Sequence, residues 1–112
     1  MEKIHLGKKR IVELEINGRE CIAALDNYAI DHFQVTNGKG FLKAIEGIQN
    51  HSITSIIALL GSIIRDKKTN KPLGGKYFKQ FDTMDIVSSL MPVITELIPD
   101  NLPQAGNKKE KK

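Results

Sequence analysis

The first patterned segment of the chain alternates apolar and charged residues and predicts a β-hairpin. In residues 11–16 (IVELEI), aliphatic side chains fall on one face and two glutamates on the other, which is typical of a half-buried strand. Asn17-Gly18 follows at once, and both residues tolerate the positive φ of a two-residue type I′ turn. The return strand over 19–24 then turns Cys21 inward. Because a lone hairpin is marginally stable in water, it must pack on something, and residues 2–6 are a candidate third strand.

The chain after the hairpin has the spacing and the punctuation of helices. The clearest helix begins after Ser52, a good N-cap, and its isoleucines and leucines recur at i, i+3, i+4 and i+7. Pro92 lies inside the last helix, where it removes one backbone hydrogen bond and predicts a kink or a restart. The predicted helices cover 27–36, 41–48, 53–65 and 83–98, with caps at Asp26 or Asn27, Ser52, and Asp82 or Thr83, and a brief turn holds Tyr77, Phe78 and Phe81 as an aromatic plug. The predicted fold class is α+β: an N-terminal hairpin, with two or three strands, followed by four or five helices.

Composition separates one folded domain from a tail. The chain has 112 residues, of which 40% are hydrophobic and 27% charged, enough for one buried core. We therefore expect a single α+β domain over 1–98 and a disordered Pro- and Lys-rich tail over 99–112. The last five residues (KKEKK) account for three of the net charge of +4, so the body is nearly balanced. A balanced body does not offer the basic surface that nucleic-acid binding requires.

The sequence also disfavours a membrane-spanning or secreted protein. The longest uncharged stretch, 50–64, is shorter than the ~20 apolar residues of a bilayer span and rich in Ser and Thr. Charged residues near the start leave no room for the apolar run of a signal peptide. The single cysteine cannot form an internal disulfide and suits a reducing compartment. These features predict a soluble cytoplasmic protein with no membrane partner.

No pattern of residues indicates catalysis or a cofactor. Three histidines lack a second ligand at metal-binding spacing: His5, His32 and His51. The glycine–lysine segments at 37–40 and 74–76 lack the spacing of a phosphate-binding loop. We therefore expect no enzyme, no catalytic residues, no cofactor and no metal.

The last predicted helix carries more apolar surface than one core requires. Nine of the fifteen residues from Met84 to Ile98 are apolar, in two adjacent stripes, whereas a helix on one core needs an arc of about 100° or a little more. Either the helix is enclosed by its own domain, or part of the arc meets another chain, which would be a second copy or a client helix. The helix over 53–65 is a candidate to share that surface. The candidate partner-binding residues are Ile56, Leu60, Ile63, Ile86, Leu90, Val93 and Leu97.

The order and spacing of several segments resemble those of the tail assembly chaperones of long-tailed bacteriophages of Gram-positive hosts. The segments are INGREC (16–21), ALDNYAIDHF (24–33), TNGKGFLKAI (36–45), SITSIIALLGSIIRD (52–66), KPLGGKYF (71–78) and ELIPDNLP (96–103). The resemblance spans about residues 10–103. The chain departs from the family pattern at Cys21, where a larger aromatic residue is common, and at Pro92 in the last helix.

The resemblance implies a non-enzymatic protein of the infected host's cytoplasm that is absent from the mature virion. Such a protein binds the long, helix-rich tape measure protein, keeps it soluble and helps tail tube subunits polymerise around it. Self-association is also expected, and relatives are often made in two lengths by ribosomal slippage. The alternatives are a structural, oligomeric protein of the phage tail or head–tail connection, and a small nucleic-acid-binding protein that would use the cluster at 8–10 and the terminal lysines.

Overall fold

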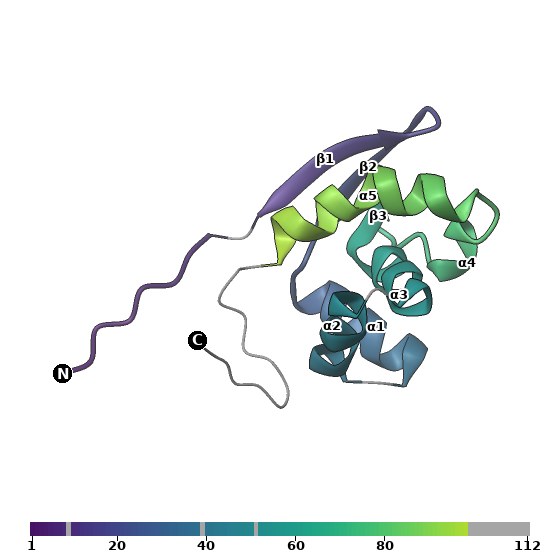
Figure 1. The fold of residues 1–112 in the computed structure, drawn as a ribbon. Helices are drawn as coiled ribbons and strands as arrows, with labels where there is room; N and C mark the ends of the chain where they lie inside the picture. The colour runs from purple at the N-terminus through teal and green to yellow at the C-terminus, as the bar shows by residue number, and fades with distance from the viewer. Residues whose placement is uncertain (9, 39, 51, 99–112) are drawn as a thin grey trace.

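The structure, a computed structural model, describes residues 1–8, 10–38, 40–50 and 52–98, and they form an α+β fold (Figure 1). The strands are β1 (Ile11–Ile16), β2 (Arg19–Ala24) and β3 (Ile64–Asp66). The helices are α1 (Asn27–Asn37), α2 (Phe41–Gln49), α3 (Ile53–Ile63), α4 (Gly75–Phe78) and α5 (Thr83–Leu97). The predicted fold class, a hairpin followed by helices, is confirmed. The predicted tail over 99–112 lies outside the described residues.

The hairpin forms in the predicted register. Asn17 and Gly18 have φ of 50° and 87°, the positive values that a tight two-residue turn requires. Cys21 lies opposite Leu14 and is buried on the inner face.

The prediction of a third strand over 2–6 is wrong, because residues 2–6 have no strand partner. The third strand is β3, which pairs antiparallel with β2 and gives the sheet the order β1-β2-β3. The expected helix over 53–65 therefore ends two residues early. Helix α3 ends at Ile63, and Ile64 begins β3. Both residues belong to the same apolar run, and periodicity alone does not distinguish the end of a buried helix from the start of a buried strand.

Three helices begin at side-chain caps. The hydroxyl of Ser52 accepts a bond from the backbone N–H of Ser55 at 3.3 Å, and the Asp82 carboxylate accepts one from Asp85 at 3.0 Å. Asp26 caps α1 in the same way through Ala29. Helix α5 continues through Pro92 as one helix, so of the two expected outcomes, a kink or a restart, the restart does not occur.

The core lies where α3 meets the other helices and the sheet. Leu60 has none of its surface exposed, and Phe33 and Phe41 meet edge to face with ring centroids 6.4 Å apart. Gly61 allows α3 to lie close against the start of α4, since a Cβ there would overlap the backbone of Gly75. The backbone N–H of Gly74 donates to the carbonyl of Gly61 at 2.9 Å, which fixes the chain leading into α4 against α3.

A buried ion pair ties β3 to the start of α1. The guanidinium of Arg65 donates to both oxygens of Asp26 at 3.1 Å, and its carbon lies 5.1 Å from the centre of the Tyr28 ring. The Arg65 side chain is 6% exposed and that of Asp26 14%. A bidentate pair this deep holds the two elements in one geometry.

Candidate partner-binding groove

An apolar groove of about 430 Å³ lies between β1 and the first three turns of α5. Its residues come from the end of β1, from the segment around α4 and from α5, with none from β2 or β3: Leu14, Glu15, Ile16, Asn17, Phe78, Phe81, Asp82, Asp85, Ile86, Ser89, Leu90 and Val93. The groove therefore opens beside the edge of β1 that does not face β2.

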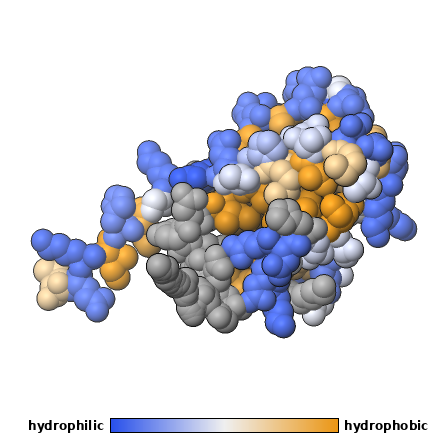
Figure 2. All heavy atoms as spheres, viewed as in Figure 1, coloured by the Kyte–Doolittle hydropathy of each residue, from blue (hydrophilic) through white to orange (hydrophobic). Residues whose placement is uncertain are grey.

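The walls of the groove follow from local sequence patterns. The alternation in β1 turns Leu14 and Ile16 toward α5, and both are only half-buried. Tyr77 meets Phe78 and Phe81 edge to face, with centroids 5.2 and 5.3 Å apart. The predicted aromatic plug therefore forms, and two of its three rings, Phe78 and Phe81, line the groove. Figure 2 shows apolar residues gathered along the middle of one face, bordered by hydrophilic ones.

The rim of the groove is acidic. Glu15 lies on the β1 side, and Asp82 and Asp85 on the α5 side, and all three are exposed. The described lining contains no lysine, arginine or histidine. An apolar floor with an acidic rim fits a ligand that presents aliphatic side chains flanked by basic ones.

The structure places most of the candidate partner-binding residues inside the domain, and their binding to a partner stays a prediction. Six of the seven are at most 9% exposed: Ile56, Leu60, Ile63, Ile86, Leu90 and Leu97. The three from α5 are enclosed because α5 packs on β1 and α3 at once, but other apolar residues of its wide arc are not: Met84 is 68% exposed. Ile86, Leu90 and the half-buried Val93 still line the groove, whereas the members from α3 do not.

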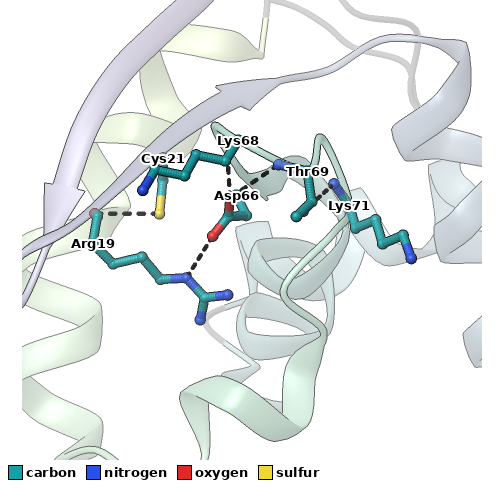
Figure 3. A network of polar contacts seen from close by, with 6 residues as sticks. All are labelled: Arg19, Cys21, Asp66, Lys68, Thr69 and Lys71. Atoms are coloured by element: carbon teal, nitrogen blue, oxygen red, sulfur yellow. Dashed lines mark hydrogen bonds and ion pairs between the residues drawn. The ribbon is translucent and has the colours of Figure 1, made fainter.

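A polar network supports the hairpin on the side of β3 (Figure 3). The Asp66 carboxylate accepts bonds from Arg19 Nε at 2.9 Å and from the backbone N–H groups of Lys68 and Thr69 at 2.8 and 3.1 Å. These bonds, led by the one from Arg19, lower the pKa of Asp66 below its ordinary value. Arg19 also lies 5.2 Å from the centre of the Tyr77 ring, so the network reaches the aromatic plug.

A second hollow, of about 460 Å³, lies between α1, α3 and α4 and has a different character. His32 Nδ1 lies 2.8 Å from Ser62 Oγ, a pairing that sequence spacing missed because the residues are 30 apart. Lys76 and Lys79 also line this hollow, and no carboxylate does. Ser62 is 1% exposed, and its hydroxyl is hydrogen-bonded to His32 within the fold.

In the described residues, no group of three or more histidine, cysteine, aspartate or glutamate side chains is placed to hold a metal ion. Over the same ranges, every helix is too short or too polar to cross a bilayer.

Comparison with known protein families, with curated proteins and with solved structures finds no match to this chain. The groove between β1 and α5 therefore has to be interpreted from its own chemistry.

Proposed function

We propose that this protein is a phage tail assembly chaperone that carries an amphipathic helix of the tape measure protein in the groove between β1 and α5. The observation that carries the proposal is the groove itself: a concave apolar strip with an acidic rim, on a domain whose other large apolar side chains are mostly enclosed. The order of segments that resembles this chaperone family points the same way.

The chemistry of the groove suits a carrier better than a permanent structural partner. Its floor is built from half-buried side chains such as Leu14, Phe81 and Val93, which pack against the core in the absence of a ligand. A client helix adds the missing apolar cover and is released when a competing surface offers more. An unassembled tape measure helix exposes such a stripe and aggregates unless it is covered. Tail tube subunits would supply the competing surface during polymerisation.

The experiment is co-expression with a tape measure protein, the long, helix-rich client that the proposal names. Substitution in the buried stripes, such as Leu90→Asp, would unfold the domain and say nothing about binding. The informative variants are Val93→Asp, in the floor, and Ser89→Lys, an exposed residue of the lining. Val35→Asp is the matched control, because Val35 is 79% exposed on α1, outside the groove.

The proposal predicts that the intact chain and Val35→Asp keep the client soluble and co-purify with it. Both groove variants are expected to capture at least about tenfold less client, since a charge in an apolar contact costs more than 1.4 kcal/mol of binding free energy. Thermal unfolding checks that the variants fold. A client that is soluble alone, or captured equally by all variants, would contradict the proposal. Recovery of the chain from purified virions would instead favour the structural tail protein.

A further inference from the structure

The N-terminal arm, residues 1–8 and 10, carries two highly exposed aliphatic residues. Ile4 is 75% and Leu6 84% exposed, and the arm has no assigned secondary structure. Figure 1 shows it extended away from the body, and Figure 2 shows apolar residues along it. Residues two apart in an extended segment point to the same side. Ile4 and Leu6 thus form a short apolar face that its own domain leaves uncovered.

The edge of β1 offers what such an extended segment lacks. In the described sheet β1 pairs with β2 alone, so its other edge presents unpaired backbone groups, a template for a further strand. The groove opens beside this edge, because β1 and α5 line it and β2 does not. A strand added there continues the sheet and directs alternate side chains into the groove.

The charges of the arm and of the groove are complementary. Apart from Arg10, which bonds to its own α5, the described arm carries Lys3 and Lys8 against a single acidic residue, Glu2. The groove rim carries the three exposed carboxylates of Glu15, Asp82 and Asp85. Opposite charges on the two surfaces favour their encounter and set the direction in which the strand lies.

We propose that the arm of a second copy of this chain adds to the free edge of β1 and places Ile4 and Leu6 in the groove. The arm does not reach its own groove in the structure. Arg10 Nη1 donates to the carbonyl of Glu96 at 2.8 Å, which fixes the start of the arm at the C-terminal end of α5, whereas the groove spans residues 82–93 of α5. Reciprocal exchange of two arms fills both grooves and closes the assembly as a symmetric dimer.

The arm and the client helix are alternative occupants of the groove, so the exchange also regulates client binding. This regulation, unlike the exchange itself, rests on the proposed function. A bound arm hides the apolar floor until a client helix displaces it. Arm and client then need not differ in chemistry, because both present aliphatic side chains flanked by basic ones.

The test is sedimentation of the full chain over a concentration series. The intact chain is expected to form a dimer that dissociates on dilution and weakens as salt is added. Ile4→Asp combined with Leu6→Asp is expected to weaken the dimer by more than about a hundredfold, since four buried aliphatic contacts are lost per dimer. Val35→Asp, an equally exposed aliphatic residue on α1, serves as the control and leaves the dimer unchanged.

Two outcomes would overturn the exchange. The first is a single-chain mass at every concentration, which would mean that the arm stays free or folds onto its own groove. The second is a dimer whose stability does not change with the arm substitutions. Client capture separates this result from the proposed function. The arm double variant keeps an intact groove, so it still captures the client if the proposed function holds. A dimer without any client capture supports the exchange and rejects the chaperone.

Discussion

The side chains of α5 are fully buried on one side of the helix and only partly buried on the other. Toward α3, Ile94 is 1% exposed, and α3 itself packs so closely on the residues before α4 that Gly61 has no room for a side chain. Toward the edge of β1, Val93 is half-buried and opens onto a groove of about 430 Å³. The same helix thus packs into a closed core on one side and borders an open groove on the other.

This difference separates the residues that hold the fold from those free to bind. A wide apolar arc by itself does not distinguish them, since both sides of α5 are apolar. Substitutions on the closed side should therefore cost stability, and substitutions on the groove side should cost binding with little loss of stability.

Truncation of Leu60 should have the largest effect on the free energy of unfolding. Leu60→Ala removes a side chain with 0% exposure and leaves a cavity, so we expect a loss of about 2–5 kcal/mol. Val93→Ala is the counterpart on the groove side, with an expected loss of about 1 kcal/mol or less. Chemical denaturation measures both. Equal losses would mean that the two sides are closed alike.

Gly61→Ala should come next, with a loss of about 2–3 kcal/mol. Its Cβ would meet the backbone of Gly75 rather than a flexible side chain, so α3 and α4 must separate. Gly40→Ala is the control, because a Cβ at Gly40 has no neighbour within 4 Å, and the change should stay within about 1 kcal/mol. A neutral Gly61→Ala would show that the contact between α3 and α4 is loose.

Pro92→Ala should stabilise the groove side by about 1 kcal/mol or more. Pro92 is exposed inside α5 and lacks the N–H that would bond the carbonyl of Ser88, four residues earlier. The midpoint of thermal unfolding measures the gain. A lower midpoint would mean that the shape which Pro92 gives to α5 is itself needed for packing on β1.

The smallest effect concerns acid stability and the Asp66 network. Because the pKa of Asp66 is lowered in the folded chain, its stabilisation is fully present above the unfolded value of about 3.9 and is lost as the pH falls through the folded value. The stability difference between the intact chain and Asp66→Asn should therefore shrink below about pH 4. A difference that is constant over that range would contradict the role assigned to the Arg19 contact.

The hairpin and the helix starts could be predicted because each rests on a local signal. Asn17-Gly18 sets its own turn, and Ser52 satisfies a backbone donor three residues away. Strand β3 could not be predicted in this way, since its pairing with β2 joins residues more than forty positions apart. The groove lay beyond sequence reasoning for the same reason. Periodicity marked Ile86, Leu90 and Val93 as apolar, but only the packing of β1 decides which of them border open space.

The buried Cys21 gives this chain a practical property. It is the only cysteine of the chain, it is 1% exposed, and burial raises the pKa of its thiol, so it reacts slowly with thiol reagents at neutral pH. Cysteines introduced at Glu15 and Ser89, on opposite walls of the groove, would accept spin labels without removal of the native residue. The distance between the two labels would then report in solution whether the groove is empty or filled.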